Sequence, residues 1–334
     1  MSTRIRWGIA ATGGIARAFA QGLALVDDAE LVAVASRTEE RAHDFAAEVG
    51  APHAHGSYEA LAADPGVDVV YVASPHARHC ADAVRFLDAG KHVLCEKPLA
   101  LSAAQVREMA EAAHRNDRFL MEALWSRFLP AYVELRRVLA EGAIGQPRLV
   151  EADFGFRIPD IDPTHRLFDL AQGGGALLDL GIYPLNLAFL VLGHPVEVRA
   201  VGHLGATGAD EQTAAVLQHL DGALSAVKAA VRTNLSCTAR IAGTEGTIAV
   251  PAFMHCPQHL VVQTGAGEER IEAPMEGNGL HHQVFEVHRC LGAGLTESPV
   301  MPLSESLALA TAMDDIRTQI GLRYPGEPDS GGAR

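Results

Sequence analysis

Lys97 and Tyr183 are the two side chains whose types best suit acid–base chemistry. Lys97 lies in the run Cys95-Glu96-Lys97-Pro98, and Tyr183 lies in a run that starts with three consecutive glycines and ends at Pro184. Removing a hydride from the carbon of an alcohol also requires a group that takes the hydroxyl proton. Free tyrosine has a pKa of about 10, and a neighbouring ammonium favours the phenolate. We therefore predict that Lys97 lowers the pKa of Tyr183 and that Tyr183 moves the proton.

The segment that carries Tyr183 is predicted to be a helix over residues 175–192. Asp179 and Tyr183 are four residues apart, so on a helix they share one face. Pro184 cannot donate the helical hydrogen bond and should kink the helix beside Tyr183, which would open that side chain to a cleft. The same segment is strongly apolar, so the alternative is that Tyr183 is only the boundary residue of a buried helix.

The N-terminal residues have the order strand, glycine turn, helix. Residues 4–10 are mostly apolar, Gly8 to Ala16 form the turn, and residues 17–25 have helical spacing of apolar side chains. Such a turn lets the backbone approach a pyrophosphate at a helix N-terminus. The expected cofactor contacts are Ala11, Thr12, Gly13, Gly14 and Ile15. Ala11 replaces the first glycine of the usual pattern, and an ordinary tight turn is the alternative interpretation.

The second strand indicates which dinucleotide is used. Residues 31–35 form a buried-strand run, and Ser36-Arg37-Thr38 follows where an acid would hold the ribose of NAD. A guanidinium and hydroxyls suit the 2'-phosphate of NADP. We therefore predict NADP, with NAD less suitable. The alternative for Arg37 is a solvated side chain in a turn that opens a helix.

The alternation of strands and helices continues through the first third of the chain. Residues 67–73 and 92–95 are predicted strands, and residues 77–89 are a predicted helix. Repeats of this kind imply a parallel, doubly wound sheet that binds ligands at the carboxyl ends of its strands. Ser74-Pro75-His76 and Glu96-Lys97-Pro98 fall at such ends. The sequence leaves the peptide bond before Pro98 open between cis and trans.

From residue 148 onward the sequence pattern changes to consecutive strand-like runs joined by short turns. This pattern predicts an α+β domain with a large, mostly antiparallel open sheet, one face of which packs against the 175–192 helix. The expected boundaries are 1–122 for the Rossmann domain and 123–322 for the second domain. Residues 303–321 are a predicted helix that could return to the first domain. Residues 323–334 are expected to be a frayed tail.

The motifs resemble those of the glucose-fructose oxidoreductase, inositol dehydrogenase and MocA (Gfo/Idh/MocA) family. The resemblance rests on Trp7-Gly8-Ile9 with Gly13, on the run from Ala89 to Leu99, and on the run from Gly173 to Pro184. The run from Met121 to Pro130 and the run from Glu297 to Leu303 resemble the branch of dimeric dihydrodiol dehydrogenases and NADP-dependent aldose (xylose) dehydrogenases.

The resemblance implies roles for individual residues. Lys97 would be the catalytic lysine, Tyr183 the general acid–base, and Asp179 the acid one helical turn earlier. Trp125 and Arg127 would lie on the nicotinamide side of the pocket. Ser74, Pro75, His79 and Glu96 would line the cofactor, with His76 where relatives frequently have Asn. The resemblance also implies a homodimer paired through the C-terminal sheet.

Arg166 and His165 are further polar candidates, placed just before the three glycines. Either side chain could hydrogen-bond a polyhydroxylated substrate. The alternative for Arg166 is a salt bridge to Asp162 or to Asp169.

Composition narrows the classes of function. The chain has 334 residues, is 48% apolar and carries a formal net charge of -14, which argues against a nucleic-acid partner. We expect a cytoplasmic protein without a membrane segment, a disulfide framework or a metal site, since its five cysteines are scattered and its 16 histidines show no ligand spacing. The predicted function is NADP-dependent hydride transfer on a sugar, cyclic polyol or dihydrodiol. A keto-sugar reductase and a non-catalytic NADP-binding sensor are the alternatives.

Overall fold

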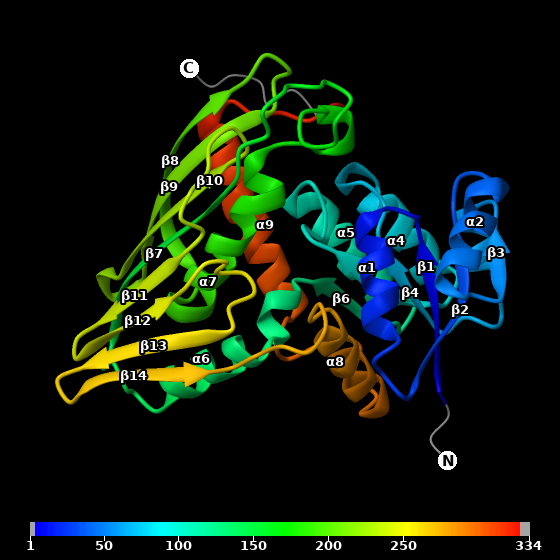
Figure 1. The fold of residues 1–334 in the computed structure, drawn as a ribbon. Coiled ribbons are helices and arrows are strands. Elements are labelled where there is room, and N and C mark those ends of the chain that lie inside the picture. Colours follow the sequence, from blue (N-terminus) through cyan, green and yellow to red (C-terminus); the bar gives the residue numbers. More distant parts are fainter. Residues whose placement is uncertain (1–3, 328–334) are drawn as a thin grey trace.

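The structure is a computed structural model that describes residues 4–327. Two sheets, with helices between and around them, make up this part of the chain (Figure 1). The first sheet has the strand order β3-β2-β1-β4-β5-β6, and every pairing in it is parallel. Its strands are β1 (Ile5–Ala10), β2 (Ala29–Ala35), β3 (His53–His55), β4 (Val69–Val72), β5 (His92–Glu96) and β6 (Leu120–Ala123).

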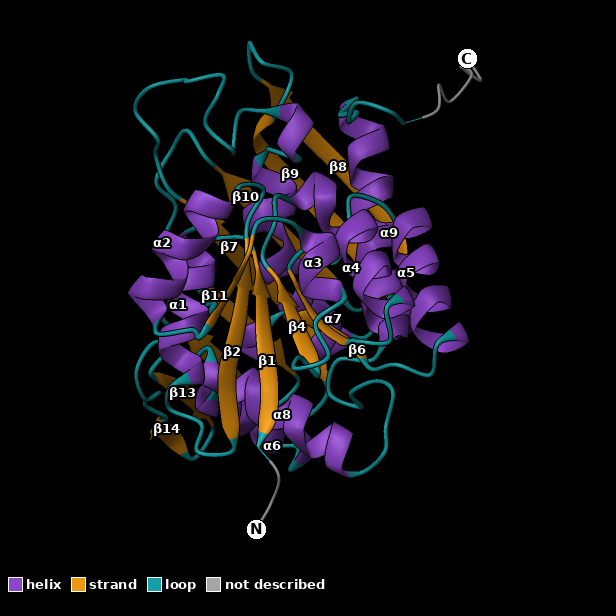
Figure 2. Ribbon diagram, turned by 90° about the vertical axis from the view of Figure 1, so that its right-hand side faces the viewer, coloured by secondary structure: helices purple, strands orange, loops and turns teal. Residues whose placement is uncertain are grey.

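Helices cover both faces of the first sheet (Figure 2). They are α1 (Gly14–Leu23), α2 (Glu39–Val49), α3 (Tyr58–Ala62), α4 (His79–Asp88) and α5 (Ala103–Arg115), with a short 3-10 helix η1 (His76–Arg78) before α4. All four residues of β4 are buried, as in strands covered on both sides. Side chains cap the first turn of three of these helices, through Thr38 before α2, Ser57 before α3 and Ser102 before α5.

The second sheet has the order β14-β13-β12-β11-β7-β10-β9-β8. Its strands are β7 (Pro147–Gly155), β8 (Pro195–Leu204), β9 (Asp210–His219), β10 (Leu224–Ala230), β11 (Ala239–Gly243), β12 (Gly246–Val250), β13 (His259–Thr264) and β14 (Gly267–Glu272). The pairings are antiparallel apart from β7 with β10. Buried and exposed residues alternate along β9, so only one face of the sheet is covered.

The remaining helical elements follow β6 in the chain. They are α6 (Pro130–Ala140), α7 (Ile182–Leu192), α8 (His281–Gly292) and α9 (Leu303–Ile320), together with the short elements η2 (Trp125–Phe128), η3 (Leu170–Gln172), η4 (Leu177–Gly181) and η5 (Leu220–Gly222). In Figure 1, α7 and α9 lie between the two sheets, and α9 packs on both α5 and β8. The last helix thus contacts both domains, and the predicted fold class is confirmed.

The helix that carries Tyr183 begins as a π-helix, η4, and continues as α7, of which Pro184 is the third residue. One prediction about the chain is wrong. The frayed tail does not begin at residue 323, since Tyr324 is buried and its ring packs under the Arg317 guanidinium. Residues 328–334 of the expected tail lie outside the described residues.

The apolar segment Leu170–Leu192 is long enough to cross a membrane, but 83% of its most apolar window is buried inside the fold. It is therefore the central core helix. Among residues 4–327, no group of three or more His, Cys, Asp or Glu side chains gathers in a way that could hold a metal ion.

Candidate active site

A cavity of about 1500 Å³ lies at the carboxyl ends of the parallel strands and extends to the second domain. Most of the predicted site residues line it: Ala11, Thr12, Gly13, Gly14, Ile15, Ser36, Arg37, Ser74, Pro75, His76, His79, Glu96, Lys97, Trp125, Arg166, Asp179 and Tyr183. The two halves of the chain thus contribute to one site. His79 takes a structural part in it, because its ring nitrogens lie 2.8 Å from the carbonyl oxygens of Pro98 and Ser74.

The glycine turn leaves the first turn of α1 open toward the cavity. Gly13 is the N-cap residue, its backbone is extended, and it provides no side-chain cap. A Cβ added at Gly13 or Gly14 would meet no atom within 4 Å. Uncapped N–H groups and the positive end of the helix dipole are therefore available to an anion. Ala11 has φ of 95°, so this first position of the motif has the left-handed backbone that normally favours glycine.

Arg37 and Arg41 differ from the other arginines around the cavity. Within residues 4–327 neither forms an ion pair, whereas Arg17 pairs with Glu48 and Arg78 and Arg85 both pair with Asp82. Arg37 follows β2 directly, and Arg41 lies in the first turn of α2. Arg41 was not predicted from the sequence, although its position four residues after Arg37, at the start of a helix, was an available signal.

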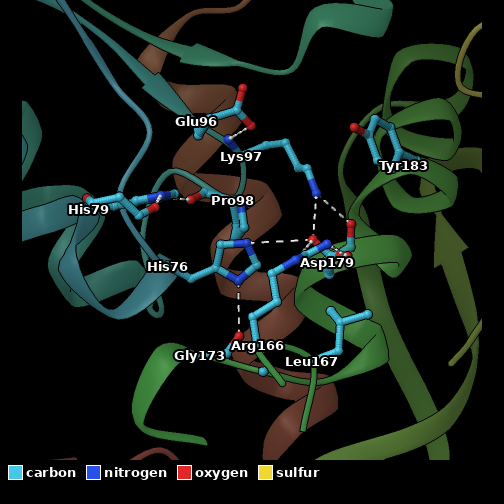
Figure 3. A network of polar contacts seen from close by, with 12 residues as sticks. His76, His79, Glu96, Lys97, Pro98, Arg166, Leu167, Gly173, Asp179 and Tyr183 are labelled. Carbon is cyan, nitrogen blue, oxygen red and sulfur yellow. Dashed lines mark hydrogen bonds and ion pairs between the residues drawn. The ribbon is translucent and has the colours of Figure 1, made fainter. Parts of the chain in front are cut away.

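Lys97 and Asp179 form an ion pair between the two domains (Figure 3). The Lys97 Nζ donates to Asp179 Oδ1 at 2.9 Å and to the Asp179 carbonyl oxygen at 2.7 Å. Carbonyls at the junction of η4 and α7 lose regular helical partners, because the helix type changes there and Pro184 has no N–H. Lys97 uses one of these carbonyls. The Lys97–Pro98 peptide bond is cis.

Arg166 binds the same carboxylate through both of its oxygens. Its two terminal nitrogens donate to Asp179 at 2.9 and 3.1 Å, so neither Asp162 nor Asp169 is its partner and that alternative is wrong. The His76 Nε2 lies 3.7 Å from Asp179, and its Nδ1 lies 3.0 Å from the carbonyl oxygen of Gly173. Burial alone would raise the pKa of Asp179, but Lys97 and Arg166 outweigh it and hold that pKa well below its usual value. Asp179 is therefore a permanently charged anchor.

Tyr183 lies on the cavity side of α7, and its hydroxyl accepts a hydrogen bond from Trp125 Nε1 at 3.0 Å. The Lys97 Nζ lies 5.2 Å from the centre of the Tyr183 ring, over its face. Burial raises the pKa of Tyr183 to about 12 even though the Lys97 charge lowers it. Lys97 thus acts in the predicted direction, but burial outweighs the ammonium, and the net pKa of Tyr183 lies above its ordinary value.

Comparison with known proteins identifies the family. Residues 5–124 match the oxidoreductase family with an NAD-binding Rossmann fold, GFO_IDH_MocA, and residues 132–249 match the GFO/IDH/MocA C-terminal domain. The chain belongs to the Gfo/Idh/MocA family. The predicted family is thus confirmed, and the protein is an NAD(P)-dependent oxidoreductase acting on alcohol-type donors.

Three similar proteins illustrate the range of the Gfo/Idh/MocA family. Trans-1,2-dihydrobenzene-1,2-diol dehydrogenase of Danio rerio is 40% identical over 330 residues, covering 96% of this chain and 98% of the relative. Aldose-aldose oxidoreductase from Caulobacter crescentus, solved with glycerol, is 27% identical with a TM-score of 0.86, covering 95% of this chain and 97% of its own. A 3-ketoreductase from Actinomadura kijaniata, solved with NADP and TDP-benzene, is 27% identical with a TM-score of 0.85, covering 95% and 98%.

Two residues predicted for the site of this Gfo/Idh/MocA protein lie elsewhere. Arg127 does not line the cavity, because its buried guanidinium binds Asn186, Glu305 and the carbonyl of Val300. It therefore joins η2 to α7 and α9 instead of facing a nicotinamide. His165 is exposed and packs beside Phe168, outside the cavity lining.

An aromatic group on the second-domain side of the cavity was not predicted from the sequence. His255 stacks on Phe154 with ring centres 4.5 Å apart and lies 5.1 Å from Tyr183 and 5.8 Å from Trp125. Burial lowers the pKa of His255 to about 4, so the ring is neutral at ordinary pH, and its buried Nδ1 has no partner within the described residues. Phe154 and Phe156 near the end of β7 were a recognisable signal; His255, in a loop 100 residues later, carried none.

Proposed function

We propose that this protein is an NADP-dependent dehydrogenase that oxidises a secondary alcohol of a trans-dihydrodiol or a sugar, with Tyr183 as the proton acceptor. The observation that carries the proposal is the juxtaposition of Tyr183, Lys97 and Asp179 from two domains at the wall of one cavity. A non-catalytic sensor has no need for an ammonium held beside a buried phenol. Bound NADP supplies the acceptor for the hydride.

Each residue around the Tyr183 hydroxyl has a separate role in the proton transfer. The Tyr183 oxygen accepts the substrate hydroxyl proton in the oxidation and returns a proton in the reverse direction. Lys97 favours the ionised oxygen through its charge, and Asp179 with Arg166 fixes the position of Lys97 and balances that charge. Trp125 donates to the Tyr183 oxygen, so it orients that oxygen and stabilises its ionised form.

The choice of NADP rests on Arg37 and Arg41. Within residues 4–327 these two cations form no ion pair with a carboxylate. Beside Ser36 at the end of β2, they fit the 2'-phosphate of NADP better than the bare ribose of NAD. The test is direct binding by quenching of tryptophan fluorescence. Arg37→Ala and Arg41→Ala should each weaken NADPH binding by at least tenfold and change NADH binding by less than threefold. Equal losses for both coenzymes would refute the phosphate role.

The substrate class follows from the aromatic group and the polar end of the same cavity. Trp125, Phe154 and His255 offer flat apolar surfaces, which suit an unsaturated ring or the apolar face of a sugar. Arg166 and the free Nδ1 of His255 supply polar contacts for neighbouring hydroxyls. The relatives named dihydrodiol dehydrogenases support the diol as the first substrate to test. NADPH formation from trans-dihydrodiols and from aldoses, compared by kcat/KM, decides between the two.

A keto-sugar reductase is the second candidate, because the cavity is large and one solved neighbour is a 3-ketoreductase with NADP bound. The residues would act in the same way, with Tyr183 giving its proton to a carbonyl oxygen. Faster NADPH consumption with a 3-keto sugar than NADPH formation with any diol would favour this candidate.

We also propose that the protein is a cytoplasmic homodimer paired through the outer face of the second sheet. The side chains of Val201, Val216 and Leu224 are 73%, 51% and 42% exposed on neighbouring strands of that sheet. An open sheet that exposes branched apolar side chains is suited to a partner.

A further inference from the structure

The glycine triplet, residues 173–175, is held by three different parts of the molecule. The carbonyl oxygen of Gly173 lies 3.0 Å from the Nδ1 of His76, at the carboxyl end of β4. The carbonyl oxygen of Gly174 accepts from the Tyr324 hydroxyl at 2.8 Å. Gly175 has φ of 127° and lies directly against Asp210, so that a Cβ there would overlap the Asp210 Oδ1. The triplet is therefore a junction between the first domain, the C-terminal segment and the second sheet.

Asp210 fixes the helix that follows the triplet. It is the first residue of β9 and is fully buried, and its Oδ2 accepts from Leu177 N at 2.8 Å and from the Thr213 hydroxyl at 2.7 Å. Leu177 is the first residue of η4, where the N–H groups of a helix have no intrahelical acceptor. Asp210 satisfies one of them from another strand. Asp179 follows only two residues later in the same turn.

Tyr324 is itself held by Arg317, near the end of α9, and by Glu327, in the segment after α9. The Arg317 guanidinium lies 5.1 Å from the centre of the Tyr324 ring and pairs with Glu327 at 2.7 Å, while the Tyr324 N–H donates to Glu327 at 3.0 Å. Glu327 therefore contacts both Arg317 and the backbone of the buried Tyr324. Arg317 and Glu327 thus hold the Tyr324 ring and backbone, and the Tyr324 hydroxyl reaches the carbonyl oxygen of Gly174.

We propose that Tyr324 and Asp210 are positioning residues that set where the Asp179 carboxylate lies relative to Lys97. The proposal rests on the proposed function. Neither residue lines the cavity, so neither touches substrate or cofactor. They act through the triplet and the first turn of η4, and misplacing a catalytic group by about 1 Å costs about 100-fold in rate. The C-terminal segment is in this way part of the support of the active site.

The chain offers a readout that does not depend on activity. It has three lysines, Lys91, Lys97 and Lys228. The Lys97 side chain is 12% exposed and bound to Asp179, whereas that of Lys228 is 55% exposed. Acetylation by an N-hydroxysuccinimide ester, followed by peptide mass spectrometry, reports the Lys97 rate against the Lys228 rate. Loosening of Asp179 frees the Lys97 amine and raises that ratio.

The test compares Tyr324→Phe with Thr318→Val. Tyr324→Phe deletes the hydrogen bond to the triplet, and Thr318→Val deletes another hydroxyl-to-carbonyl bond of 2.8 Å, on the exposed side of α9. We expect Tyr324→Phe to raise the Lys97 labelling ratio severalfold and to lower kcat by about threefold to tenfold, the range for one hydrogen bond. The NADPH Kd and the substrate KM should change by less than twofold. Thr318→Val should change none of these quantities.

Asp210→Ala and Asp210→Asn form a second pair. Asp210→Ala should lower kcat and raise the Lys97 labelling ratio more than Tyr324→Phe does. Asp210→Asn should bring both kcat and the labelling ratio most of the way back to the wild-type values, because an amide oxygen can still accept from the Leu177 N–H. Unchanged kcat per folded enzyme in Tyr324→Phe overturns the proposal, as does an equal fall in Thr318→Val. If the wild-type protein turns over no alcohol or carbonyl, the labelling ratio alone decides: a rise supports the positioning role while the proposed function fails, and no rise refutes it.

Discussion

Tyr183 is the residue whose surroundings most constrain the chemistry. Burial raises its pKa to about 12, and the Lys97 charge works in the opposite direction. The ionised fraction of a base of this kind grows as pH rises toward its pKa, so kcat/KM for oxidation should increase through pH 10 without a plateau near neutrality. The measurement is a pH profile of kcat/KM with the best diol or aldose.

The same profile tests Lys97. Because Lys97 is the group that lowers the pKa of Tyr183, Lys97→Met should shift the rise to higher pH as well as lowering the maximum. Lys228→Met, which removes an exposed lysine paired with Asp153 at 3.3 Å, is the control and should leave the profile in place. A profile that Lys97→Met lowers uniformly, without a shift, would show that Lys97 does not tune Tyr183.

Residue types at the ends of predicted strands and helices could be recognised from the sequence. Lys97, Asp179 and Tyr183 do lie together, as their motifs predicted. The balance of energies at Tyr183 was not predictable, because it depends on how deeply the ring is buried by residues far away in the chain. The pairing of Arg166 with Asp179 was missed for a similar reason: the glycine triplet folds the Arg166 loop back over η4, and sequence distance alone favoured Asp162 and Asp169.

At the scale of elements, Arg127 joins three of them. It lies on η2, binds Asn186 on α7 and pairs with Glu305 on α9, and its side chain is 4% exposed. Removing Arg127 leaves the largely buried Glu305 carboxylate with His194 at 2.7 Å as its remaining contact among residues 4–327, and breaking a buried ion pair in this way costs about 3–5 kcal/mol. We expect that loss for Arg127→Met in urea unfolding, and a smaller loss when Glu305→Leu is added. A double variant less stable than the single one would show that the charge of Glu305 does not cause the loss of stability in Arg127→Met.

Asp210 makes the stability of the protein depend on pH in an unusual direction. Burial raises its pKa to about 7, although hydrogen bonds from Thr213 and Leu177 lower it. The folded state therefore binds a proton that the unfolded chain releases at about pH 4. The bound proton adds its full share to the free energy of unfolding below pH 4, and this share is lost as pH rises to 7. It amounts to at most about 4 kcal/mol, at 1.36 kcal/mol per unit of pKa difference between the folded and unfolded states.

The test is the free energy of unfolding of wild type and Asp210→Asn at several pH values. The difference between them should move in favour of Asp210→Asn as pH rises from 4 to 7 and then stay constant. A constant difference across the whole range would mean that Asp210 is ionised throughout in the folded state.

At the scale of the whole molecule, the two sheets share one hydrophobic core that runs from Trp7 in β1 to Tyr324 after α9. The order of strands and helices predicted both sheets, since local periodicity reflects which faces are covered. It did not predict that the chain returns to the triplet after its last helix. A short Gly- and Pro-containing segment resembles a tail unless the pocket that receives Tyr324 is known.

The exposed face of the second sheet leads to a prediction about assembly. Light scattering should give twice the chain mass of 35.4 kDa, and Val201→Asp should give the monomer. A charge facing another subunit cannot be hydrated at a packed interface. Leu295→Asp, at another exposed apolar position, is the control and should remain a dimer. A wild-type mass of a single chain at micromolar concentration would contradict the proposed dimer.

The central claim is that Tyr183 transfers the substrate proton in an NADP-dependent oxidation, and one comparison tests it most directly. Wild type and Tyr183→Phe are assayed for NADPH formation with a trans-dihydrodiol and an aldose, and NADPH binding is measured in parallel. Loss of a general base costs about 100-fold to 10,000-fold, so we predict that loss in kcat with an NADPH Kd within twofold of wild type. A Tyr183→Phe variant that keeps near-normal kcat would contradict the account.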